Sequence, residues 1–155
     1  MPEQMSGVQL FLRYAWPCAE NKLRIGQISQ NDFVDLKWFV ENKIKPETCF
    51  LRKCFPKAIR ALEEFAIKED KDLWTLETVT KYWRYHHGHT GNCAVRFGEV
   101  VFTYKDGTDF VKVVEHEPFY VVCVNSYNLK LDFGDQVSFH QLHIVEKIEQ
   151  GAIEG

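Results

Sequence analysis

The chain has 155 residues, a net charge of −3 and an aromatic content of 14%. Its 45% hydrophobic and 26% charged residues are ordinary for a folded soluble protein, which excludes intrinsic disorder. No apolar run approaches the roughly 18 residues of a membrane span, and the N-terminal stretch is not a secretory signal. No stripe of Lys and Arg is present to neutralise phosphates, so we expect no binding to nucleic acid.

The cysteines indicate a reducing compartment. The sequence contains Cys18, Cys49, Cys54, Cys93 and Cys123, an odd number, and no pair has C-x-x-C spacing. Without an export signal, such a set favours reduced thiols over a disulfide framework. We therefore expect a cytoplasmic protein.

Before about residue 90, apolar residues recur at helical spacing. Ser6 is the predicted N-cap of a first helix that runs through Tyr14 and ends at Pro17, and a polar loop follows to about Gln30. Further helices are expected over 31–42, 47–67 and 75–85. Pro56 should split or kink the third, because proline removes a helix hydrogen bond. Four helices with short connections predict a small helical bundle.

From Cys93 onward, β-branched and aromatic residues come in short runs between turn signals. Strands are expected over 93–104, 109–116 and 119–124, with a short element at 128–133 and a final strand or strand pair at 136–148. Asp106-Gly107 is a strong hairpin signal. About five antiparallel strands fit a small barrel of the OB or SH3 kind. The fold class is thus α+β, with a helical region at 1–90, a barrel at 91–150 and a tail at 151–155.

One segment has the composition of a transition-metal site. Imidazole and thiolate groups, the usual ligands of iron, zinc, nickel and copper, are concentrated at His86, His87, His89 and Cys93. The final strand region adds His140, and closure of the sheet would bring it close to Cys93. A glycine-rich linker that happens to contain histidines remains the alternative.

A second segment has the composition of a partner-binding patch. Arg13, Tyr14 and Trp16 combine a guanidinium with two aromatic rings at the end of the first predicted helix. Helix packing followed by a proline stop explains the same residues and is the more frequent outcome.

Two C-terminal stretches resemble the NiFe-hydrogenase maturation chaperones of the HypC/HupF type. Residues 92–101 (NCAVRFGEVV) are similar to their cysteine-led opening, and 134–148 (GDQVSFHQLHIVEKI) to their later Gly-Asp-x-Val-x-x-His stretch and its ending. The resemblance implies an OB-type barrel in which Cys93 matches the cysteine that helps to hand over an iron–cyanide–carbonyl unit. Because Cys93 is internal and has no free α-amino group, the implied role is docking to a hydrogenase subunit or maturation protein.

The whole chain resembles an uncharacterised family often found beside hydrogenase genes. The shared motifs are Leu-Phe-x-Arg-Tyr-Ala-aromatic-Pro, here residues 10–17, and Gly-Asp-x-Val-Ser-x-His, here residues 134–140. Trp83 and the His86-His87 pair are similar to tryptophan and double-histidine motifs of that family, which adds Trp83 to the predicted partner-binding residues.

These observations favour a non-catalytic accessory or maturation factor for a NiFe hydrogenase or a related metalloenzyme. Its partners would be the hydrogenase large subunit or maturation proteins. Aromatic residues would hold the client, while Cys93 and His140 would contact iron or its precursor. A small metal-dependent enzyme or metal carrier that uses the cluster from His86 to Cys93 is the first alternative. A structural subunit of a hydrogenase complex is the second.

Overall fold

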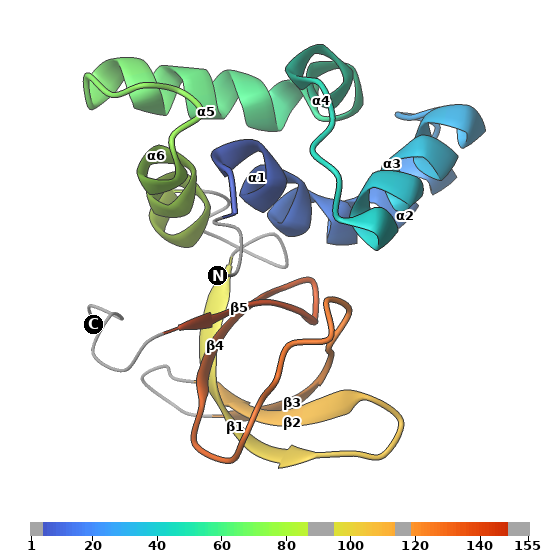
Figure 1. The fold of residues 1–155 in the computed structure, drawn as a ribbon, viewed down its shortest axis with the longest axis vertical. Coiled ribbons are helices and arrows are strands. Elements are labelled where there is room, and N and C mark those ends of the chain that lie inside the picture. The colour runs from blue at the N-terminus through green and yellow to red at the C-terminus, as the bar shows by residue number, and fades with distance from the viewer. Residues whose placement is uncertain (1–4, 87–94, 114–118, 149–155) are drawn as a thin grey trace. The chain divides into compact units, whose positions relative to one another are not determined.

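The computed structural model describes residues 5–86, 95–113 and 119–148 (Figure 1). The chain divides into two compact units, Met1–His87 and Gly88–Gly155. The first unit is helical and the second is a β-barrel, so the expected α+β class is confirmed. Among the described residues, no helix has the length and apolar character needed to cross a membrane.

The described part of the first unit contains six α-helices, a 3₁₀ turn and a π-helical turn. The helices are α1 (Gly7–Ala15), α2 (Ala19–Arg24), α3 (Gln30–Asn42), α4 (Thr48–Cys54), α5 (Pro56–Lys68) and α6 (Leu76–Lys81). The 3₁₀ turn covers Trp16–Cys18, and the π-helical turn covers Tyr82–His86.

Local sequence chemistry sets several of these helix ends. Ser6 caps α1 with a capping box, in which its hydroxyl accepts from the Gln9 backbone and the Gln9 side chain accepts from the Ser6 backbone. Pro56 occupies the first position of α5, where its missing N–H is not needed, and it divides the predicted 47–67 segment into α4 and α5. The polar loop predicted before Gln30 is wrong in part, because it contains α2.

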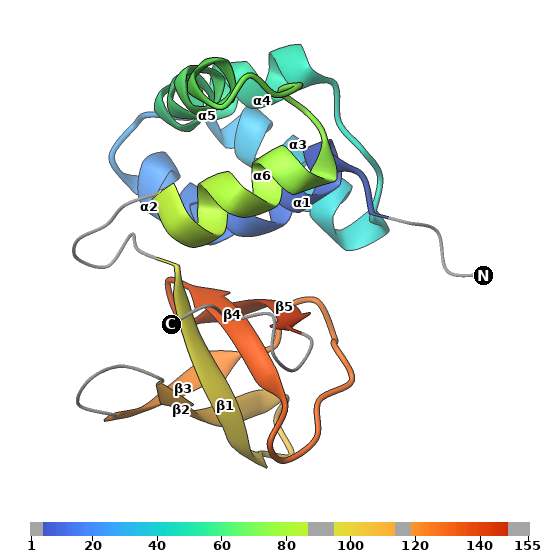
Figure 2. The same cartoon turned by 90° about the vertical axis from the view of Figure 1, so that its left-hand side faces the viewer.

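Aromatic rings form much of the core of the helical unit. The Phe11 ring lies edge-on to Phe55, Trp74 and Trp83, with centroid separations of 6.3, 5.5 and 5.3 Å. Gly7 of α1 lies against the backbone of Trp74, where an added Cβ would come 2.8 Å from the carbonyl carbon, so α1 packs close to the start of α6 (Figure 2).

The second unit is a closed five-stranded barrel. Its strands are β1 (Arg96–Thr103), β2 (Thr108–Val113), β3 (Phe119–Val124), β4 (Gln136–His140) and β5 (His143–Ile148). They follow the order β1-β2-β3-β5-β4, and β4 pairs with β1 to close the barrel (Figure 2). All pairings are antiparallel except β3 with β5. The placement of β4 beside β1 is a Greek-key connection and is compatible with an OB/SH3-like barrel.

Glycines shape β1 and its hairpin. Gly107, at φ 90°, gives the β1–β2 turn the positive φ that its Asp-Gly sequence predicts. Gly98 allows close approach to β2, since an added Cβ would lie 2.9 Å from the Lys112 carbonyl oxygen. The described barrel core contains Val100, Val111, Val113, Cys123, Val137, Phe139 and Ile144.

One element of the barrel differs from the sequence-based expectation, and at 136–148 one of the two expected arrangements is confirmed. Residues 128–133 form no strand; Leu129 and Leu131 pack partly buried against the core without a ladder. The 136–148 segment is a strand pair, separated by Gln141 and Leu142 at φ 53° and 63°.

Candidate functional site

The predicted histidine–cysteine cluster is described only at His86. His86 ends the π-helical turn, and its exposed ring lies 4.4 Å from the Phe65 ring, centroid to centroid. His87, His89 and Cys93 lie outside the described residues. Within the described ranges, no group of three or more His, Cys, Asp or Glu side chains is arranged to hold a metal ion. The cluster therefore stays a prediction.

His140 lies inside the barrel unit. Its side chain is fully buried in β4, and it is paired in register with His143 of β5. The His143 Nδ1 lies 2.6 Å from the Ser126 hydroxyl, which anchors the 125–128 turn to the start of β5. His140 and His86 belong to different units, and a shared site between Cys93 and His140 stays a prediction.

The four predicted partner-binding residues lie at different depths in the helical unit. Tyr14 and Trp83 are buried, and their rings stack with a centroid separation of 5.6 Å and an interplanar angle of 9°. Trp16 is half-buried and stacks on Phe33 at 5.3 Å. Arg13 donates from Nη1 to the Met5 sulfur at 3.5 Å. Tyr14 thus serves the packing role that the sequence left open, and Trp83 packs in the same core, where a ring cannot contact a partner.

A different aromatic surface lies on the barrel, where sequence reasoning did not place one. In the register of the sheet, Phe102 of β1 lies opposite Phe110 of β2, which lies opposite Val122 of β3. Phe110 also stacks on Tyr120 at 5.1 Å and 12°. We define the aromatic face as Phe102, Tyr104, Phe110, Tyr120, Val122 and Val124. Apart from half-buried Phe110, its members are exposed, with Phe102 at 57% and Tyr120 at 53%.

Beneath that face, the barrel core contains a buried polar pair. Asp109 of β2 is fully buried and lies opposite Cys123 of β3. One Asp109 oxygen accepts from the Thr103 hydroxyl at 2.6 Å, and the other has no hydrogen-bond partner among the described residues. Burial, with a smaller contribution from the Asp109 carboxylate, raises the pKa of the Cys123 thiol to about 12. The thiol is therefore protonated near neutrality, and it is a packing group rather than a nucleophile.

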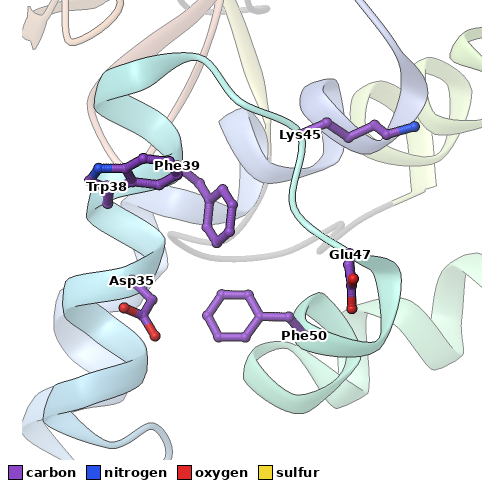
Figure 3. A pocket seen from close by; sticks show the side chains of 6 residues that line it. All are labelled: Asp35, Trp38, Phe39, Lys45, Glu47 and Phe50. Atoms are coloured by element: carbon purple, nitrogen blue, oxygen red, sulfur yellow. The ribbon is translucent and has the colours of Figure 1, made fainter.

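Within the described part of the helical unit, an open groove of about 530 Å³ lies between α3 and α4 (Figure 3). We call it the α3–α4 groove. It is lined by Asp35, Trp38, Phe39, Lys45, Glu47 and Phe50. The lining residues come from two helices and their connection, so no sequence motif announces the groove.

No family description, no curated protein and no solved structure matches this chain.

Proposed function

We propose that the protein is a non-catalytic accessory factor whose barrel docks to a partner protein through the aromatic face. The exposure of this face is the observation that carries the proposal. A contiguous exposed apolar patch on a folded protein marks an interaction surface, and aromatic side chains are enriched at the centres of protein interfaces. Within the described residues, the exposed side chains of the aromatic face therefore favour protein docking over catalysis.

The spacing of the face suits a flat, rigid contact. Cross-strand pairs fix three of the side chains in one layer, at Phe102, Phe110 and Val122. The stacked Phe110–Tyr120 pair holds the Tyr120 ring in place, so docking costs little side-chain entropy. Buried aromatic anchors of this kind supply most of the energy in well-packed interfaces.

The partner we propose is a NiFe-hydrogenase large subunit or one of its maturation proteins. The support is the resemblance of residues 92–101 and 134–148, both in the barrel unit, to the hydrogenase maturation chaperones. Residues 88–155 carry five Lys and Arg against ten Asp and Glu, so the docking surface of the partner should be basic or neutral. In this role, Cys93 would contact the iron precursor that the client receives.

Co-expression with a NiFe-hydrogenase large subunit and its maturation proteins tests the proposal. We expect the full chain to co-purify with one of them, and the double substitution Tyr120→Ala with Val122→Ser to abolish the complex. Phe133→Ser is the matched control, because Phe133 is 78% exposed in the same unit but lies outside the aromatic face. Complex formation that survives the double substitution would refute docking through this face.

A second arm tests the hydrogenase assignment itself. Cys93→Ala should lower the activity of the matured client while the complex still forms. If no large subunit or maturation protein co-purifies with the wild-type chain, the hydrogenase partner is excluded, whatever the variants show.

A further inference from the structure

We propose that the α3–α4 groove binds an arginine side chain presented by a partner polypeptide. The inference concerns the helical unit and is independent of the docking proposed for the barrel. It stands on three properties of the groove: its aromatic wall, its two carboxylates, and its open shape.

The aromatic wall is formed by Trp38, Phe39 and Phe50, and the Phe39 ring lies next to the other two. Trp38 and Phe39 are successive residues of α3, and their centroids lie 5.3 Å apart at 79°. Phe39 in turn lies 5.7 Å from Phe50 of α4. Trp38 is 51% exposed, so its indole remains accessible at the mouth of the groove. Tryptophan is the side chain that attracts a cation most strongly through its ring face.

Two carboxylates flank the wall. Asp35 lies one turn before Trp38 and Phe39 on α3, and its carboxylate points toward the Phe50 ring, while Glu47 lies at the start of α4 (Figure 3). Among the described residues, no Lys, Arg or His nitrogen lies within 4.0 Å of either carboxylate; the contact to Glu47 is the Cys49 thiol at 3.5 Å.

The other two carboxylates of α3 are each paired with a lysine. Asp32 is paired with Lys53 at 3.2 Å, and Glu41 is paired with Lys37 at 3.9 Å. Of the three carboxylates of α3, the one without an internal cation is thus Asp35, which lines the groove. Lys45 also lines it, but its side chain extends away from Asp35 and Glu47 (Figure 3). The groove therefore offers negative charge beside aromatic faces to a cation from outside.

Guanidinium is the cation that uses both features. It is planar and stacks on an aromatic ring, and its fork of N–H groups donates to a carboxylate at two points. An ammonium group is more strongly hydrated and stacks less well, and a quaternary ammonium has no N–H to donate to Asp35 or Glu47. The groove is open along one side, which suits a side chain carried by a polypeptide better than a ligand that must be enclosed.

The test uses the full-length chain and three probes: acetylated and amidated Gly-Arg-Gly, the matching Gly-Lys-Gly, and free L-arginine. Binding is followed by the indole resonance of Trp38, assigned by its loss in Trp38→Phe. We expect a saturable shift with Gly-Arg-Gly and a weaker response to Gly-Lys-Gly. Asp35→Asn and Glu47→Gln should each weaken binding by about threefold, the effect of one exposed ion pair.

The controls separate a site from general charge attraction. Glu64→Gln removes a carboxylate from an exposed position of α5 and should leave the affinity unchanged. Lys45→Met should strengthen binding, because it removes a positive charge from the groove lining. Equal responses to the two peptides, or wild-type affinity in both groove variants, would overturn the proposal. Tighter binding of free L-arginine than of Gly-Arg-Gly would also overturn it, in favour of a small-molecule site.

Discussion

Alkaline pH should destabilise the barrel through a single buried thiol, Cys123. The folded state holds this thiol in the core with a pKa of about 12, against 9.0 for an unperturbed cysteine. Between these two values the unfolded chain has lost the proton and the folded chain still binds it. Raising the pH therefore favours unfolding. The contribution is fully present below pH 9.0 and is lost as the pH rises toward about 12.

The size of the effect follows from the shift. One pKa unit corresponds to about 1.4 kcal/mol, so the free energy of unfolding should fall by up to about 1.4 kcal/mol per pH unit in this window. Over the full window, the limit is about 4 kcal/mol, which is a large share of the stability of a small domain. The main cause of the shift is the burial of the Cys123 side chain, which disfavours the charged thiolate in the folded state.

The assay compares the wild-type chain with Cys123→Ala, so that the other alkaline titrations cancel. Urea unfolding is followed at pH 8 to 11, under reducing conditions, by the methyl resonances of Val111 and Val137 in the barrel core. Tryptophan fluorescence reports the helical unit separately, because all four tryptophans precede residue 88. The difference between the two proteins should be constant to about pH 9 and then move against the wild type. Parallel curves up to pH 11 would refute the reasoning.

Three further predictions rest on local geometry. Gly98→Ala should destabilise the barrel by about 1–3 kcal/mol, because the added Cβ would overlap the Val111 side chain and the Lys112 carbonyl. In urea unfolding, the additional substitution Val111→Ala should partly restore the stability of Gly98→Ala. Ser6→Ala should cost the helical unit about 1 kcal/mol through loss of the α1 cap, measured by thermal unfolding, whereas Ser126→Ala should leave that unit unaffected. Among the described cysteines, a thiol reagent at pH 8 should modify exposed Cys49 much faster than Cys54 or Cys123, because burial raises the pKa of the latter two thiols to about 12. Mass spectrometry measures the rates of modification, and equal rates would contradict the burial of Cys54 and Cys123.

Features with a local cause were predictable from the sequence. The Ser6 cap, the Pro56 division and the Asp106-Gly107 turn each depend on the chemistry of one or two residues, and the structure contains all three. The short polar helix α2 was missed because Ala19–Arg24 carries no apolar stripe. Residues 128–133 were expected to form a short element because Leu129 and Leu131 alternate with polar residues. These leucines alternate because they pack on the barrel core, so the pattern here reflects burial without strand pairing.

Side-chain orientation in β4 needed the tertiary structure. Strict alternation places Ser138 and His140 opposite Val137 and Phe139, yet all four are buried. The pairing of β4 with β5 shifts register between Ser138 and Phe139, and such a shift depends on the partner strand. The aromatic face was hidden for a related reason: β3 is apolar on both sides, so its sequence does not reveal which side faces solvent.

The α3–α4 groove depends on side chains from Asp35 to Phe50 that meet only after α3 and α4 pack. No spacing rule connects a ring at the end of one helix with a ring at the start of the next. The sequence therefore predicts a site at the histidine run, where residues of metal-ligating type are dense, and gives no sign of a surface whose chemistry arises from the fold.

Among the described residues, one parallel register pair joins β3 to β5, Val124 with His143, and it is supported by a hydrogen bond from the Val124 N–H to the Leu142 carbonyl at 2.8 Å. A junction with so few bonds is where transient separation of strands costs least. Amide protons at this junction should exchange with solvent before those of β1 and β2. Because Cys123 immediately precedes Val124, we expect oxidants to reach this thiol when the junction separates, without unfolding of the whole barrel.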